Sequence, residues 1–470
     1  MTFTSLLFLF CFLPLALAIY YIASDGVKEY VLLGVSLIFY SLGDPEFFFL
    51  FVIVTLITVI LGRIIGKTEK LIFRRILLVL GIAINVSVLC HYKYTDFAIS
   101  TLNSVTGRSI SLKELALPLG ISFFTFKSIS YLVDVYKGRA DMIGSSPARD
   151  ALYLSFFAQI QSGPLTRYEN TRIVGKEERR ELFADGVWRF MIGFGKKILL
   201  ADVLANITAK VFSTEISDLS TTYAWTGAIC FSLQLYYDFS GYSDIAIGLS
   251  EMFGIKCVEN FNHPYMTSSV SEFWRRWHIS LSHWFRDYVY IPLGGSRNKQ
   301  KYRVYFNLFA VWMLTGLWHG ANWNFIAWGL GYFVLISFER ATGLPGRFRT
   351  LWAKSFYKVF SLIFISCQWV MFNSSGVRRG LGFIKRMFIP VLNETADFKT
   401  RIILRQYYPF LIVAIVLCFP ITAFLVKMIG DRPSAGIYRT VGGVLVVLMF
   451  IWAISLVVAG LNNPFVYVDF

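Results

Sequence analysis

Long apolar runs alternate with short polar segments along almost the whole chain. A helix needs about 20 apolar residues to cross the hydrocarbon core of a bilayer, so each such run predicts a membrane-spanning helix. We expect an all-α polytopic membrane protein with about 11–12 transmembrane helices. The predicted spans cover residues 5–24, 28–43, 46–63, 75–92, 114–135, 184–205, 222–247, 303–319, 321–338, 355–373, 404–426 and 438–460.

One further apolar segment, 150–165, differs from the spans because it carries Gln159, Gln161, Gly163 and Pro164. Irregular backbone is tolerated at membrane depth only where protein surrounds it. The segment is therefore predicted to be re-entrant rather than spanning. The first apolar run ends in a string that imitates a signal-peptidase site, but no Lys or Arg precedes it, so we expect a retained membrane helix.

The composition supports a membrane protein and excludes several soluble classes. Of the 470 residues, 56% are hydrophobic and 16% are charged, and the mean hydropathy is +0.57. An average soluble domain has about 25% charged residues. A soluble enzyme, a disordered chain and a disulfide-stapled secreted domain are therefore excluded. The 6 cysteines form no CxxC pair, so neither a zinc site nor a disulfide framework is expected.

Basic residues predict the orientation of the chain. The net charge is +16, which on a soluble protein would suggest a nucleic-acid partner. Short cytoplasmic loops retain Lys and Arg, which explains the excess better, and no nucleic-acid partner is expected. Segment 63–75 is then cytoplasmic and the N-terminus lies outside. The loops 136–149, 166–183 and 339–354 fall inside, and 206–221 falls outside.

Segment 374–403 does not fit this orientation, because it should lie outside and yet is basic. Either the count of spans is off by one, or this is an amphipathic interfacial segment.

Polar residues within apolar spans are costly, so each is a candidate functional residue. A first group ends the 222–247 span, in Asp238-Phe-Ser240-Gly241-Tyr242-Ser243-Asp244. Asp238, Ser240 and Tyr242 are candidate substrate-binding residues, although a structural role in helix packing is favoured for Asp238. Gly241 is expected to break the helix between the two carboxylates.

A second group, Glu272-Phe-Trp274-Arg275-Arg276-Trp277-His278, interleaves aromatic and basic residues as segments at the membrane interface do. Arg275 and Arg276 have the planar guanidinium that holds a phosphate in bidentate fashion. An interfacial helix that extends its arginines to water explains the pattern equally well. Positive charge continues to residue 303 and is expected to attract an anionic substrate, through Arg286, Arg297, Lys299, Lys301 and Arg303.

The third group surrounds His319, in Thr315-Gly316-Leu-Trp318-His319-Gly320-Ala-Asn322-Trp-Asn324, between two apolar spans. A neutral imidazole accepts a proton from a hydroxyl near pH 7, so His319 is a candidate general base. A satisfied core histidine is an equally good interpretation. The flanking glycines are expected to leave room for a substrate. No histidine pair has the spacing of a metal site, so no bound metal is expected.

These strings resemble the membrane-bound O-acyltransferase family, and within it the bacterial branch that O-acetylates alginate, peptidoglycan and other polymers. The string from Arg275 to His278 and the later Trp318-His319-Gly320 carry the resemblance most specifically. Leu117–Phe126, Ser162–Tyr168 and Asp238–Asp244 also match, as does Arg286-Asp287-Tyr288, and the resemblance covers about residues 1–340. Lys127 departs from the branch, where Gln is expected, and either pairs with Asp134 or touches the acyl donor.

The resemblance implies an acyltransferase with His319 as the catalytic histidine and His278 as a second key residue. It implies a ring of tilted helices around a thin centre, where a cytoplasmic funnel and an outer funnel nearly meet. We expect one membrane domain over residues 1–470, with N-terminal helices at 1–113, a catalytic core at 114–340 and C-terminal helices at 341–470. The expected substrate-binding residues are Arg275, Arg276, Trp274, Trp277, Asp238, Ser240, Tyr242, Asn322, Lys127 and Gln161.

The implied reaction moves an acyl group, with acetyl-CoA as the expected donor and no bound cofactor, in the cell membrane of a bacterium. The acceptor is either a serine of an extracytoplasmic SGNH-type partner or a hydroxyl of a polysaccharide. A D-alanyl-type transferase, which takes its thioester from a carrier protein, remains an alternative. So does a flippase of lipid-linked sugars, although that function predicts internal repeats that the sequence does not show.

Overall fold

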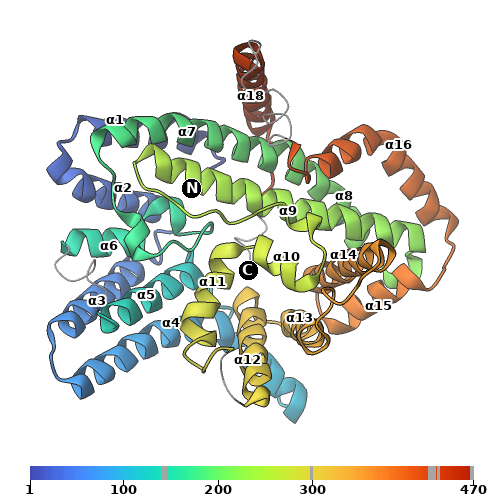
Figure 1. Cartoon of the computed structure of the whole chain (residues 1–470), viewed down its shortest axis with the longest axis horizontal. Helices are drawn as coiled ribbons and strands as arrows, with labels where there is room; N and C mark the ends of the chain where they lie inside the picture. The colour runs from blue at the N-terminus through green and yellow to red at the C-terminus, as the bar shows by residue number, and fades with distance from the viewer. Residues whose placement is uncertain (139–145, 297–299, 422–429, 431–434, 466–470) are drawn as a thin grey trace. The chain divides into compact units, whose positions relative to one another are not determined.

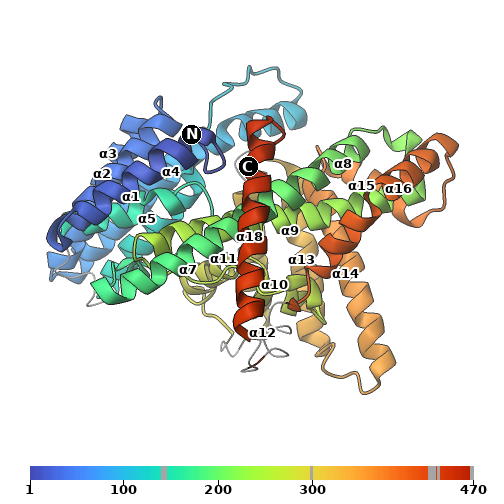
Figure 2. The same cartoon turned by 90° about the horizontal axis from the view of Figure 1, so that it is seen from above.

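The computed structural model describes residues 1–138, 146–296, 300–421, 430 and 435–465. In these residues the regular structure is helical, and the single β-bridge, between Ile173 and Ile255, is isolated. Figure 1 and Figure 2 show the helices from two directions. The prediction of an all-α protein is confirmed.

The helices are α1 Leu13–Ile22, α2 Lys28–Gly43, α3 Phe48–Lys67, α4 Leu71–Thr106, α5 Ile121–Tyr136, α6 Pro147–Ser155, α7 Lys176–Gly195, α8 Asp202–Phe212, α9 Thr221–Met252, α10 Val270–Arg276, α11 Ile279–Phe285, α12 Lys301–His319, α13 Trp323–Thr342, α14 Leu351–Asn373, α15 Val377–Phe388, α16 Glu394–Val416 and α18 Ala435–Val458. Each predicted span contains helix, although α4 and α16 depart from the predicted bounds 75–92 and 404–426, and residues 422–426 lie outside the described residues.

Five helices in the described residues are long and apolar enough to cross a membrane. They are Asp25–Gly43, Phe48–Lys67, Leu71–Thr106, Leu351–Asn373 and Thr440–Val458, and Phe8–Ile22 is a shorter apolar helix. The remaining predicted spans also contain helices, but they are shorter or carry more polar residues. Length and hydropathy therefore support a polytopic membrane protein.

The chain forms two compact units. Unit 1 contains Met1–Met191 and Tyr242–Val258, and unit 2 contains Ile192–Gly241 and the described residues from Glu259 onward. Helices α7 and α9 each begin in one unit and end in the other. The predicted single membrane domain stays a prediction.

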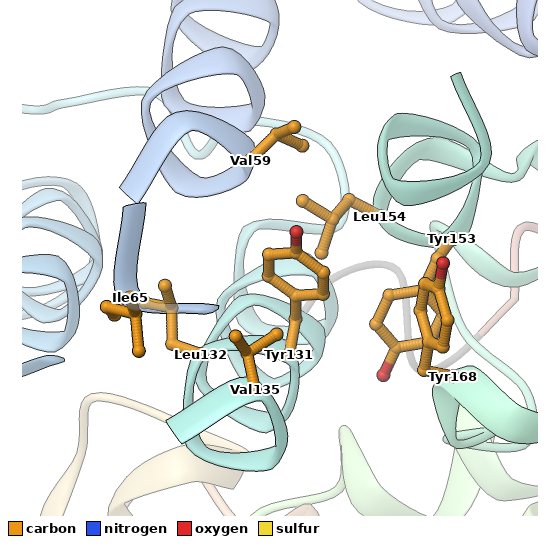
Figure 3. Packing of buried hydrophobic residues seen from close by; sticks show 8 residues of the cluster. All are labelled: Val59, Ile65, Tyr131, Leu132, Val135, Tyr153, Leu154 and Tyr168. Atoms are coloured by element: carbon orange, nitrogen blue, oxygen red, sulfur yellow. The ribbon is translucent and has the colours of Figure 1, made fainter. Parts of the chain in front are cut away.

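In unit 1 the predicted re-entrant segment is enclosed by protein. All residues from Leu152 to Thr166 are buried. The segment starts at Asp150, whose carboxylate accepts hydrogen bonds from Tyr131 Oη at 3.1 Å and Tyr168 Oη at 2.7 Å and pairs with Arg63 at 2.8 Å. Figure 3 shows these two tyrosines in an apolar cluster with side chains of α3 and α5. The burial meets the physical requirement for irregular backbone at membrane depth.

The predicted break at Gly241 is wrong, because α9 is continuous from Thr221 to Met252. A Cβ at Gly241 would lie 2.8 Å from the carbonyl oxygen of Gly193 and 3.1 Å from Cβ of Lys196. Glycine is needed here for close packing of α9 against the end of α7, not for a helix break.

The basic segment 374–403 contains the amphipathic helix α15, which buries Gly380, Phe383 and Met387 on one face. Arg379 donates to the carbonyl oxygen of Phe212 at 2.7 Å, and other carbonyl oxygens of the 212–217 loop accept from Arg379 and Arg386. The guanidinium groups of Arg379 and Arg386 therefore hydrogen-bond to backbone carbonyl oxygens of a neighbouring loop. The segment is therefore amphipathic in part, as one of the two alternatives requires, and its side of the membrane stays a prediction.

Candidate active site

Both candidate histidines lie at helix ends in unit 2 and are buried. His319 is the last residue of α12 and is 3% exposed, and His278 immediately precedes α11 and is 0% exposed. His278 has φ 43° and ψ 53°, in the left-handed region. A non-glycine residue in such a conformation costs roughly 1–3 kcal/mol, and residues of this kind cluster at functional sites.

Aromatic rings enclose both imidazoles. The ring centroid of Trp318 is 6.0 Å from that of His278 and 4.7 Å from that of His319. Trp328 packs edge-on against His319 at 4.9 Å, and Phe239 packs edge-on against His278 at 4.6 Å. The two histidines therefore neighbour one indole ring, in an apolar surrounding where electrostatic interactions are strong.

Asn260 determines which ring nitrogen of His278 carries the proton. Its side-chain oxygen lies 3.1 Å from Nδ1 of His278 and also accepts from the backbone N–H and the hydroxyl of Ser280, at 3.2 and 2.8 Å. Because this oxygen accepts in all three contacts, Nδ1 of His278 carries the proton and Nε2 carries the lone pair. Burial lowers the pKa of His278 to about 3, so the imidazole is neutral at physiological pH.

Nε2 of His278 is buried and meets no hydrogen-bond partner among the described residues. The same holds for the indole N–H groups of Trp274 and Trp328, which belong to the aromatic cluster around the histidines. Buried polar groups nearly always have partners, so each such group requires an explanation. An acceptor nitrogen and two donors are thus available for a bound molecule.

The glycines beside His319 do not leave room for a substrate, contrary to the expectation. A Cβ at Gly320 would lie 2.1 Å from the ring of Phe325, and a Cβ at Gly316 would lie 2.6 Å from the carbonyl oxygen of the same residue. A Cβ at Gly329 would likewise lie 2.4 Å from the carbonyl oxygen of Trp312 on α12. The glycines allow α12 and α13 to pack closely, and this packing sets the position of His319.

The predicted substrate-binding residues in and just after α10 differ in their exposure. Trp274 and Trp277 are buried in the aromatic cluster. Arg275 is exposed, while the guanidinium of Arg276 is held by Glu272, one turn earlier, at 2.7 and 2.9 Å. Arg275 therefore has the more accessible guanidinium of the two.

Of the more distal basic residues, Arg286 pairs with the neighbouring Asp287 at 2.8 Å. Lys301 and Arg303 are exposed at the start of α12. Arg297 and Lys299 lie outside the described residues.

Asp238 takes part in a buried ion-pair network, which agrees with the structural role favoured for it. Lys197 donates to its carboxylate at 2.6 Å, pairs with Asp202 at 2.7 Å, and donates to the carbonyl oxygen of Pro464 at 3.0 Å. All three charged side chains are at most 2% exposed. Ser240 is buried nearby in the chain, and its hydroxyl meets no partner among the described residues.

Three predicted residues belong to unit 1, where two pairs form. Tyr242 donates to Oε1 of Gln161 at 3.2 Å, and Lys127 donates to Oε1 of Gln159 at 3.2 Å. Of the two alternatives for Lys127, the ion pair with Asp134 is wrong, since Gln159 takes that place, and contact with the donor stays a prediction. Lys127 is 1% exposed and its ammonium lies 5.0 Å from the ring centroid of Tyr153.

Asn322 immediately precedes α13, but its side chain does not cap the helix and makes one long contact, at 3.5 Å to the carbonyl oxygen of Ser375. Asn324 is the better-placed amide, because it is buried and donates to the carbonyl oxygens of Met371 and Phe372 at 3.3 and 3.1 Å. Neither Asn260 nor Trp328 was predicted to have a role. The only sequence feature that pointed to Asn260 was its place in a polar string between predicted spans.

Comparison with known proteins assigns the class. The MBOAT, membrane-bound O-acyltransferase family, matches residues 145–377, which include both histidines. The chain belongs to this family: it is a multi-pass membrane protein and an O-acyltransferase.

Three relatives define the similarity further. The chain is 39% identical to the probable alginate O-acetylase AlgI of Pseudomonas aeruginosa, over 83% of this chain and 75% of the relative. It is 34% identical to the peptidoglycan O-acetyltransferase of Helicobacter pylori, over 82% and 79% of the two chains. The teichoic acid D-alanyltransferase of Bacillus subtilis is 33% identical, but over 47% of this chain and 58% of the relative.

Proposed function

We propose that the protein transfers an acetyl group from a cytoplasmic thioester, acetyl-CoA, to a hydroxyl on the outer side of a bacterial inner membrane. The support is the similarity to O-acetylating relatives over more than four fifths of the chain. The similarity to the D-alanyltransferase covers less than half of it, which favours acetyl transfer over D-alanyl transfer.

The observation that carries the chemistry is the pair of buried histidines beside one indole ring, one of them with Nε2 held as a base. In our proposal His319 takes the proton of the acceptor hydroxyl, and the hydroxyl oxygen attacks the thioester carbonyl carbon. The new C–O bond forms as the C–S bond breaks. The imidazolium of His319 then returns the proton to the departing CoA thiolate.

His278 supports this step as a second neutral base. With its proton on Nδ1, its Nε2 accepts a hydrogen bond from the acceptor hydroxyl or from a water that relays the proton. The indole N–H of Trp328, beside His319, donates to the carbonyl oxygen as negative charge develops on it. Nε2 of His278 and the indole N–H of Trp328 have no hydrogen-bond partner among the described residues, and the ring of His319 contacts that of Trp328.

Donor recognition is assigned to the exposed basic residues. Coenzyme A carries several negative charges, and fixed positive charges raise the local concentration of an anion. Arg275 presents its guanidinium outward from α10, three residues before His278. Its planar fork suits a phosphate of the donor.

The acceptor is a cell-surface or secreted polysaccharide, reached directly or through a serine of an SGNH-type partner protein. The alginate and peptidoglycan O-acetylating relatives support a polymer acceptor.

Purified protein in lipid vesicles, given acetyl-CoA radiolabelled in the acetyl group, tests the proposed function. The expected result is label on a polysaccharide or SGNH-type acceptor present on the opposite side of the membrane from the donor. Transfer that requires a D-alanyl carrier protein and never uses acetyl-CoA would overturn the assignment of the donor. Movement of an intact lipid-linked sugar without acyl transfer would overturn the enzyme mechanism.

A further inference from the structure

A buried carboxylate on α13 holds the start of α10, the helix that leads into His278. Glu339 is 3% exposed. Its Oε1 accepts from the backbone N–H of Val270 at 2.8 Å and from the hydroxyl of Tyr357 at 2.9 Å. Its Oε2 accepts from the backbone N–H of Ser271 at 2.8 Å. No Lys or Arg within the described part of the chain pairs with it.

These bonds complete the N-terminus of α10. The first backbone N–H groups of a helix have no partner within the helix. Glu339 accepts two of them, and Oγ of Ser269 accepts that of Glu272 at 3.0 Å. A carboxylate at the positive end of a helix is favourable, and hydrogen bonds to a charged acceptor are stronger than neutral ones. The start of α10 is therefore fixed by a side chain from another helix.

The contacts along α10 show its direction against α13. Val270 meets Glu339 near the end of α13, while Trp274, one turn on, meets Tyr332 at 5.0 Å and Trp328 at 5.7 Å between ring centroids. The two helices therefore run antiparallel. The end of α10 points toward the start of α13, which is the end that follows His319.

We propose that Glu339 is a positioning residue that sets the place of His278 relative to His319; this role rests on the proposed function of the two histidines. Helix α13 carries Glu339 at one end and follows His319 at the other. Helix α10 is attached to Glu339 at its start and is followed by His278 after its end. The carboxylate thereby joins the two histidine-bearing segments through helix α13.

The test combines turnover with hydrogen exchange of backbone amides, on the full chain in lipid nanodiscs. Glu339→Gln keeps the side-chain shape but presents an NH2 group to one of its three donors. We expect kcat to fall about tenfold or more. Exchange should rise over residues 270–280 and remain unchanged elsewhere. Glu339→Asp, which keeps both carboxylate oxygens, should restore part of the kcat and of the protection.

A matched control is Asn393→Ala. Asn393 caps α16 by accepting two backbone N–H groups, from Thr395 and Ala396, each at 3.1 Å. This variant should raise exchange over 394–400 and leave both kcat and the 270–280 exchange unchanged. A folded Glu339→Gln protein whose exchange rises equally throughout the chain would overturn the positioning role.

His319→Ala separates this inference from the proposed function. It should be inactive with normal exchange over 270–280. If His319→Ala is active, the proposed function fails, whatever Glu339 does. If His319→Ala is inactive but Glu339→Gln has normal kcat or normal exchange over 270–280, the positioning role fails alone. If Glu339→Gln does not fold, a Glu339→Asp variant with normal kcat and raised 270–280 exchange would also contradict the role.

Discussion

Two buried polar clusters in unit 2 are built in opposite ways. In the first, Lys197 lies between the carboxylates of Asp202 and Asp238, at 2.7 and 2.6 Å, and a backbone carbonyl takes a further bond. In the second, the imidazoles of His278 and His319 are enclosed by aromatic rings. Nε2 of His278 meets no partner among the described residues.

This difference in hydrogen bonding distinguishes polar groups that stabilise the fold from polar groups that are available to bind a substrate. A buried charge is tolerated when it is paired and hydrogen-bonded, and such a cluster holds helices together. A neutral imidazole or indole with an unused donor or acceptor is less costly to bury, and it can bind a substrate atom. We therefore propose that the lysine–carboxylate cluster contributes stability and that the histidine cluster carries out acyl transfer.

The largest expected effect is on the lysine–carboxylate cluster. Lys197→Met leaves Asp202 and Asp238 buried without their cation, which should destabilise the protein by about 3–5 kcal/mol. Unfolding in detergent measures this change. Lys256→Met is the control, since Lys256 pairs with Glu178 at the surface with 59% exposure and should lose about 0–1 kcal/mol. Equal stability of the two variants would contradict the assignment.

The second prediction concerns the histidine cluster. His278→Ala should lower kcat at least about 100-fold, as expected for loss of an acid–base group, and should leave the protein folded. Asn260→Leu should lower kcat less, because it removes the acceptor that keeps the proton on Nδ1 of His278. Turnover per folded molecule is the measurement. If His278→Ala reduces only the yield of folded protein, His278 belongs with the structural cluster.

The third prediction isolates one donor. Trp328→Phe keeps the ring beside His319 and removes its N–H, so kcat should fall about tenfold with little change in KM. Trp225→Phe is the control, because that indole N–H already donates to the carbonyl oxygen of Met387 at 2.7 Å. If both variants retain full kcat, the indole of Trp328 does not contact the reacting carbonyl.

The smallest effect is expected at the basic surface. Arg275→Ala should raise KM for acetyl-CoA a few-fold and leave kcat nearly unchanged, since the residue is exposed and outside the aromatic cluster. Binding should also weaken with added salt, because screening reduces the attraction of exposed charges for an anion. An unchanged KM at low salt would indicate a purely interfacial role for this arginine.

The helices were predictable because apolar runs determine them, and α2, α12 and α14 begin and end close to their predicted bounds. The position of His319 at a helix end also followed from the gap between the predicted spans 303–319 and 321–338, whereas the helix end at His278 was not predicted. The role of Gly241 was not predictable, since a glycine that allows close packing looks in sequence like one that breaks a helix. Nor was the pairing of Lys127 with Gln159, which depends on the fold of a segment 32 residues away.

Single turnover by His319→Ala tests the central claim most directly. The purified variant in vesicles is mixed with radiolabelled acetyl-CoA and acceptor, and label transfer is followed beside wild type and His91→Ala, an exposed histidine on α4. The account predicts a rate at least about 1,000-fold below wild type for His319→Ala, with acetyl-CoA binding and folding intact, and a normal rate for His91→Ala. Transfer at the wild-type rate by folded His319→Ala would contradict it.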